Sequence, residues 1–90
     1  MFKTLEELIS VIRQRKRSST EGSYTNKLLN NKKLSVEKIK EEITELVDAI
    51  EKDTNKIHEA ADVLYHLMVL LEANGIKIED VMDELKKRQK

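Results

Sequence analysis

The sequence predicts an all-α protein: a helical bundle of about four to five helices that is completed by homodimerisation. Three observations lead to this prediction. The 90 residues include no proline and two glycines, so little in the composition interrupts a helix. Charged residues make up 38% of the chain, above the roughly 25% that is usual for globular domains. Apolar residues recur between them at helical spacing, and the length suits a single domain over residues 1–90.

The first predicted helix begins at Thr4, which forms a capping box with Glu7, and runs to about Arg17. Its last turn is basic, which suits the negative end of the helix dipole. The cations of this basic cluster are Arg13, Arg15, Lys16 and Arg17. After a polar loop, we expect a short helix over residues 24–30, capped by Ser23.

The longest helix should follow a loop over residues 31–34, with Ser35 as its N-cap, and end near Lys52. Either Asp53 or Thr54 is expected to cap the next helix. Because the connection between these two helices is short, we expect them to lie antiparallel and side by side.

The fourth helix is expected to run to Ala73 and to stop at Asn74-Gly75. It is apolar almost all round, which predicts a central position in the bundle. A last helix over residues 78–88 should bury its apolar side chains, which are Ile78, Val81, Met82 and Leu85. One chain has few other helices to cover the fourth, so a single copy would expose a large apolar patch. We therefore expect a homodimer.

Two acidic clusters are the most informative feature of the chain. At about 100° per residue, Glu41, Glu42 and Glu45 share one arc of the third helix. Glu59 and Asp62 share one face of the fourth, where the most apolar stretch begins. The antiparallel pairing lets the two sets face each other, and charges in apolar surroundings need partners or a metal. Carboxylates in a chain without cysteine favour Mg²⁺, with Mn²⁺ as a further possibility; a network of salt bridges is the alternative.

Three neighbours of the acidic clusters need separate interpretation. His66 lies one turn after Asp62 and is either a metal ligand or a hydrogen-bonded core residue. Tyr65 is expected to pack with its hydroxyl tethered. Lys38 shares the carboxylate arc, where it either contacts a phosphate or pairs with Glu42.

The charge balance and the apolar runs exclude several classes of protein. Lys+Arg and Asp+Glu each number 17, and this net charge of zero does not suggest a nucleic-acid partner. Disulfides are impossible without cysteine. The longest apolar run, 67–71, is far shorter than the roughly 20 residues of a membrane span, and the start lacks the apolar region of a signal peptide. We expect a cytoplasmic protein.

The spacing of the carboxylates resembles that of a known superfamily. Glu-Glu-x-x-Glu, thirteen residues and then Glu-x-x-Asp is similar to the pattern of the all-α nucleoside triphosphate pyrophosphohydrolases, which include MazG-like and dimeric dUTPase enzymes. The segments 21–25, 59–67 and 80–88 resemble, more specifically, the phosphoribosyl-ATP pyrophosphohydrolase family. This resemblance covers about Leu5 to Arg88. It implies hydrolysis of phosphoribosyl-ATP to phosphoribosyl-AMP and pyrophosphate in histidine biosynthesis, a requirement for Mg²⁺ and a homodimeric bundle.

The resemblance also assigns roles to individual side chains. The expected metal ligands are Glu42, Glu45, Glu59 and Asp62. The expected catalytic carboxylates are Glu41, Glu42 and Glu45, with Glu41 or Glu42 orienting or deprotonating the attacking water. The expected substrate contacts are Ser23, Tyr24, Thr25, Lys32, Lys33, Lys38 and Arg88. The number of metal ions and the phosphorus that is attacked stay open.

Two other functions compete with this assignment. A house-cleaning nucleoside triphosphate pyrophosphohydrolase of the MazG-like type would share the carboxylates, but the segment Gly22-Ser23-Tyr24-Thr25 argues against it. A non-enzymatic helical dimerisation module would explain the balanced charge. It would not explain acidic residues in the apolar fourth helix.

Overall fold

The computed structural model describes residues 1–89, which form five α-helices and no strand. The helices are α1 (Lys3–Arg17), α2 (Tyr24–Leu29), α3 (Lys32–Lys52), α4 (Lys56–Ala73) and α5 (Ile78–Arg88). The predicted all-α class is confirmed. None of the helices described here is long and apolar enough to cross a membrane.

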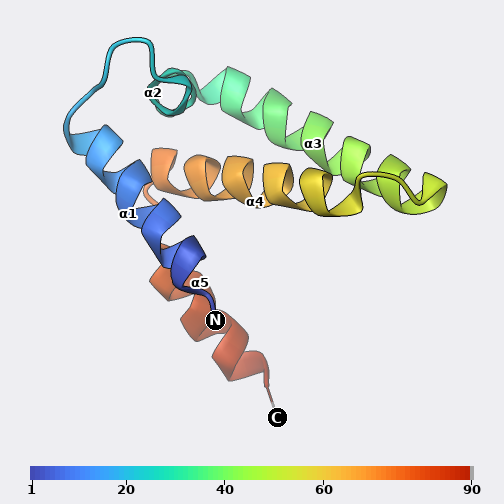
Figure 1. Ribbon diagram of the computed structural model, residues 1–90. Helices are drawn as coiled ribbons and strands as arrows, with labels where there is room; N and C mark the ends of the chain where they lie inside the picture. The colour runs from blue at the N-terminus through green and yellow to red at the C-terminus, as the bar shows by residue number, and fades with distance from the viewer. Residues whose placement is uncertain (90) are drawn as a thin grey trace.

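Helix α4 is the centre of the fold, as its apolar character predicts. It contacts each of the other four helices and lies beside α3 along an antiparallel hairpin, while α1 and α5 extend away from that hairpin (Figure 1). The hydrophobic core joins α1, α2 and α4 near the far end of the hairpin. Its buried members are Ile9, Ile12, Leu28, Met68 and Val69.

The predicted N-caps of the first and third helices are wrong. Helix α1 begins one residue before Thr4, and its N-cap, Phe2, offers no side-chain hydrogen bond. Helix α3 begins at Lys32, so residues 31–34 are not a loop: the side chain of Asn31 accepts the N–H of Leu34 at 3.1 Å. Asparagine caps a helix as well as serine does. Ser35 is therefore a buried residue inside the helix rather than its cap.

The turns around α2 and α4 show which local signals are reliable. Ser23 caps α2 as predicted, because its hydroxyl accepts the N–H of Asn26. The predicted cap of α4 at Asp53 or Thr54 is wrong, since the N-cap is Asn55, without a side-chain cap bond. Gly75 follows the end of α4 with a φ of +70°, a left-handed conformation that glycine adopts without strain.

Helix α5 has the predicted bounds but not the predicted burial. None of its residues is buried, and Met82 and Leu85 are about half exposed. The predicted burial is therefore wrong for Met82 and Leu85, whereas Val81 is half-buried and Ile78 packs against the core. Helix α5 packs on α4 and faces α1 across a groove, which leaves its outer side uncovered by the described residues.

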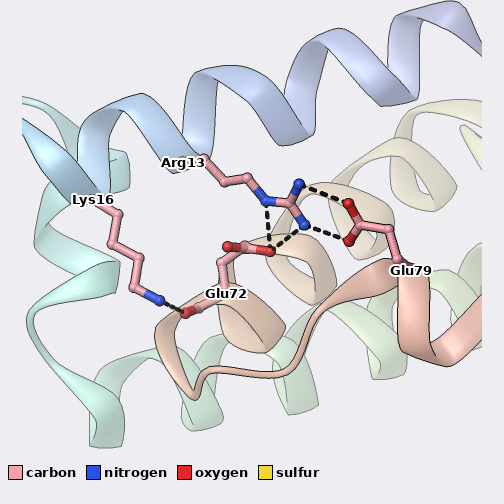
Figure 2. Close-up of polar contacts among 4 residues, drawn as sticks. All are labelled: Arg13, Lys16, Glu72 and Glu79. Carbon is pink, nitrogen blue, oxygen red and sulfur yellow. Dashed lines mark hydrogen bonds and ion pairs between the residues drawn. The ribbon is translucent and has the colours of Figure 1, made fainter.

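A network of ionic contacts ties α1, α4 and α5 together (Figure 2). Arg13 donates to Glu72 at 3.1 Å and to both carboxylate oxygens of Glu79 at 2.9 and 2.6 Å. Lys16 donates to the backbone carbonyl of Glu72 at 2.6 Å. The bond from Arg13 lowers the pKa of Glu79 to about 2. These two cations of the basic cluster therefore link α1 to α4 and α5, in addition to their favourable position near the C-terminus of α1.

Candidate functional site

The acidic residues of α3 and α4 converge along the hairpin, as their spacing predicts. Glu42, Glu45 and Glu59 each present one carboxylate oxygen, and these oxygens all lie within 4.8 Å of one another. Glu42 is buried and Glu59 is half-buried. Oε2 of Glu42 and Oε2 of Glu59 are shielded from solvent, and neither has a hydrogen-bond partner within the described residues. We call these three residues the carboxylate cluster.

Helix periodicity explains why Glu42 is the buried member. The buried residues of α3, which packs mainly on α4, are Ser35, Ile39, Glu42 and Ala49, and they recur at intervals of four, three and seven residues. Glu42 lies at the centre of this otherwise apolar or small face, rather than at its border. The helix therefore buries one carboxylate directly opposite α4.

The protonation of the cluster reflects this crowding. Burial raises the pKa of Glu42 above its ordinary value of 4.5, and the nearby Glu45 and Asp62 raise it further. Burial and the neighbouring Glu45 also raise the pKa of Glu59. Like charges close together favour binding of a proton or a cation.

Asp62 extends the site along α4. One carboxylate oxygen each from Glu59 and Asp62, together with a ring nitrogen of His58, lies within 4.8 Å. Nε2 of the exposed His58 is 3.4 Å from Oδ2 of Asp62. The acidic pattern of the sequence does not include His58, although its spacing of four residues from Asp62 places both on one face of a helix. Glu59 belongs to both groups and connects them.

The donor set fits a hard divalent cation. All the acidic ligands are oxygen donors, which Mg²⁺ and Mn²⁺ prefer, and two shielded carboxylate oxygens have no partner among the described residues. A salt-bridge network is the alternative. Within residues 1–89, no Lys or Arg is paired with Glu42, Glu45, Glu59 or Asp62. The local chemistry therefore favours a metal over structural ion pairs.

His66 connects α2 to the acidic turn of α4. Its Nδ1 lies 2.8 Å from the backbone carbonyl of Asp62, and its Nε2 lies 3.0 Å from the hydroxyl of Tyr24. Both ring nitrogens are occupied, so His66 has the role of a hydrogen-bonded core residue. Tyr65 is tethered as predicted, with its hydroxyl 2.6 Å from Oγ1 of Thr25. The predicted substrate contacts Tyr24 and Thr25 thus use their hydroxyls within the protein.

The predicted cationic contacts are spread over two regions. Lys38 lies 3.5 Å from Glu41, so it pairs with that residue and not with Glu42. Lys32 and Lys33 are exposed in the first turn of α3. Arg88 pairs with Glu84 at 3.1 Å on α5, a helix that does not contact α3 within the described chain. The lysines therefore lie on α3 together with Glu42 and Glu45, whereas Arg88 lies apart from the carboxylate cluster.

Comparisons with known proteins agree on one family. A family model described as phosphoribosyl-ATP pyrophosphohydrolase matches residues 5–89. The chain is 43% identical over 93 residues to the phosphoribosyl-ATP pyrophosphatase of Metallosphaera sedula, covering the full length of both proteins. It is 46% identical over 88 residues to the phosphoribosyl-ATP pyrophosphatase of Clostridium acetobutylicum, covering 93% of this chain and 79% of that protein. It is also 45% identical over 87 residues to the histidine biosynthesis bifunctional protein HisIE of Pyrococcus furiosus; 96% of this chain and 41% of that protein are covered.

Proposed function

Since the chain belongs to the phosphoribosyl-ATP pyrophosphohydrolase family, we propose that it hydrolyses phosphoribosyl-ATP to phosphoribosyl-AMP and pyrophosphate in histidine biosynthesis. The family predicted from the sequence is confirmed. The observation that carries the proposal is the carboxylate cluster, with its unpartnered oxygens, in a chain that matches the family model almost from end to end. A dimerisation module has no use for buried acids without partners.

We propose that Mg²⁺ is held by Glu42, Glu45, Glu59 and Asp62. A bound divalent cation neutralises phosphate oxygens and lowers the pKa of a coordinated water. The protein contributes a fixed set of negative oxygens, because α3 and α4 place them before any ligand arrives. The raised pKa values of Glu42 and Glu59 support this proposal, since groups that resist ionisation together are stabilised by an added cation.

Glu41 is the member of the acidic set that we propose for positioning the attacking water. It is exposed beside Glu42, and Lys38 holds it from 3.5 Å away. An exposed carboxylate restrained by one cation is free to accept a hydrogen bond from water. This assignment leaves Glu42 and Glu45, whose oxygens face α4, for the cation.

Binding of the phosphates is assigned to the N-terminal half of α3. Lys32 and Lys33 lie in its first turn, where the helix dipole also favours anions, and Lys38 lies about two turns later. Arg88 lies at the far end of α5, so we propose that it reaches a phosphate only if it comes from a second protomer.

The shape of the chain supports a homodimer. Its accessible surface is 6910 Å², whereas a compact monomer of this mass exposes about 5400 Å². Its radius of gyration is 14.1 Å, against about 12 Å for a compact domain of this length. The excess area of about 1500 Å² per protomer suits an obligate interface.

Part of the exposed apolar surface lies on the hairpin. Ile43, Val47 and Ile50 share one exposed face of α3, and each is about half accessible. We propose that the second copy covers this face. Sedimentation should show a dimer for the parent, and Val47→Glu should shift it toward monomer. A parent that sediments as a folded monomer at micromolar concentration would contradict the proposal.

A substrate panel tests the proposed activity. Pyrophosphate release is measured with phosphoribosyl-ATP and with ordinary and oxidised nucleoside triphosphates, with Mg²⁺ or with EDTA. We expect the highest kcat/KM for phosphoribosyl-ATP and no turnover in EDTA. A higher kcat/KM for a nucleoside triphosphate would favour the house-cleaning enzyme, and full activity in EDTA would exclude the metal.

A further inference from the structure

Tyr24 is an exposed aromatic ring beside the acidic turn of α4, since its hydroxyl bonds His66 and His66 bonds the backbone carbonyl of Asp62. The chain has one Phe, two Tyr and no Trp. Phe2 lines a groove between α1 and α5, far from the cluster in sequence and packing, and Tyr65 is half-buried. Tyr24 is 43% exposed and lies in the first turn of α2, which packs on both α3 and α4.

The ring of Tyr24 is held in place although it is exposed. Its hydroxyl lies 3.0 Å from Nε2 of His66. Its ring stacks on that of Tyr65, with centroids 6.3 Å apart and planes 19° apart, and meets the ring of His66 edge-on at 5.8 Å. A second tether, Thr25 to Tyr65 at 2.6 Å, fixes the next residue of α2. Three contacts to α4 therefore define one position for this ring.

Hydrogen bonding assigns the direction of the contact between Tyr24 and His66. The backbone carbonyl of Asp62 can only accept, so Nδ1 of His66 carries the hydrogen of the 2.8 Å bond. In the neutral ring Nε2 then has a free lone pair, and the hydroxyl of Tyr24 donates to it. The same imidazole thus connects the turn that carries Asp62 to the ring of Tyr24.

An ordered but exposed ring contributes more to ligand binding than to the stability of the fold. The exposed part of the ring contributes little apolar burial to the stability of the chain. A ring that is already ordered loses little conformational entropy when a flat ligand stacks on it. Aromatic side chains receive nucleobases in this manner in many nucleic-acid sites.

We propose that Tyr24 is a specificity-determining residue whose ring, held by His66 and Tyr65, stacks on the purine base of the nucleotide while its phosphates bind to the cation of the carboxylate cluster and to the lysines of α3. This inference rests on the proposed function. His66 is a positioning residue that acts through Tyr24. The chemical class recognised is a purine nucleoside polyphosphate, with the base and the phosphates bound by separate groups.

Two probes separate contact with the base from contact with the phosphates. The first is α,β-methylene-ATP, which cannot be cleaved between its α and β phosphorus atoms. The second is inorganic tripolyphosphate, which has no base. Both are titrated calorimetrically into the full chain with Mg²⁺. Tyr24→Leu should raise the Kd of the methylene analogue about 5- to 100-fold and change the Kd of tripolyphosphate by less than about twofold. Tyr24→Phe, which keeps the ring, should have a much smaller effect on the methylene analogue.

A matched variant tests the role of His66. His66→Asn keeps an N–H near the carbonyl of Asp62 but is too short to reach Tyr24. It should weaken the methylene analogue in the parent and have no further effect in the Tyr24→Leu background. Equal losses for both ligands in Tyr24→Leu, or no loss for either, would overturn the inference. Failure of the proposed function has a different signature, because it appears as absence of phosphoribosyl-ATP turnover in the parent.

Discussion

Replacing Glu42 by Gln should stabilise the metal-free protein and abolish its activity. Glu42 is 8% exposed, and its Oε2 has no partner within the described chain. Its pKa is raised because burial and the nearby Glu45 and Asp62 disfavour the charged form. At neutral pH the negative charge of Glu42 therefore has a higher free energy in the folded protein than in the unfolded chain. Glutamine removes that charge with nearly the same shape.

The size of the effect follows from the burial. A buried polar group without a partner costs about 1–3 kcal/mol, and more when it is charged. Glutamine keeps the polar atoms, so we expect the free energy of unfolding to rise by on the order of 1 kcal/mol. For a chain of this length that corresponds to about 4–8 °C in Tm. The gain should shrink as the pH falls through the raised pKa of folded Glu42 and be lost below about 4.5, the ordinary pKa, because Glu42 of the parent is then protonated in both states.

The assay is a set of urea melts at one protomer concentration, first in EDTA and then with Mg²⁺. In EDTA the Glu42→Gln variant should be the more stable protein. Mg²⁺ at about a hundred times its Kd should stabilise the parent by about 2.7 kcal/mol and the variant by clearly less.

Glu72 supplies the matched control. It is also 8% exposed, but it accepts a hydrogen bond from Arg13. Glu72→Gln should lower the stability by about 1.5–3 kcal/mol, the usual contribution of a hydrogen bond to a charged group, and should keep the stabilisation by Mg²⁺. A Glu42→Gln variant that is less stable than the parent in EDTA would refute the reasoning, since Glu42 would then have a structural partner.

Three further predictions concern other polar side chains. Asp62→Asn should lose nearly all activity but change the stability in EDTA by less than about 1 kcal/mol, because its partner His58 is exposed; a larger loss in urea melts would make Asp62 structural. Ser35→Ala should raise Tm, since its buried hydroxyl has no partner within residues 1–89 and alanine favours helix; a lower Tm would indicate that the hydroxyl makes a stabilising hydrogen bond. Glu79→Gln should destabilise at neutral pH. The pKa of Glu79 is lowered to about 2, so the parent should lose this advantage as the pH falls from about 4.5 toward 2, and a difference in Tm that does not depend on pH would contradict the ion pair.

The helices and the acidic face of the hairpin could be predicted from the sequence. Helical periodicity and a short connection bring Glu45 and Glu59 together whatever the exact helix ends are. The caps were less predictable, because several residues near each boundary can serve. Asn31 and Ser35 both have capping side chains, and the structure uses Asn31 while it buries Ser35 inside the helix.

Other features depend on distances that no local pattern reveals. Arg13 reaches Glu72 and Glu79, which are 59 and 66 residues away along the chain. The basic last turn of α1 predicts a cation near a helix end but gives no information about these partners. Similarly, Met82 lies on an amphipathic face and would be expected in a core. It is half exposed because no other helix of this chain packs over it.

The two buried glutamates show how one helix combines folding with chemistry. Glu72 near the end of α4 meets Arg13, and this network fastens α1 and α5 around the core. Glu42, which faces the beginning of α4, meets Glu45 and Glu59 and no cation among the described residues. Folding alone would favour an arginine partner for Glu42 too, or an apolar residue in its place. Because the chain neutralises one buried carboxylate and leaves an equally buried one among acids, we propose that it tolerates the cost of the second in order to bind a cation there.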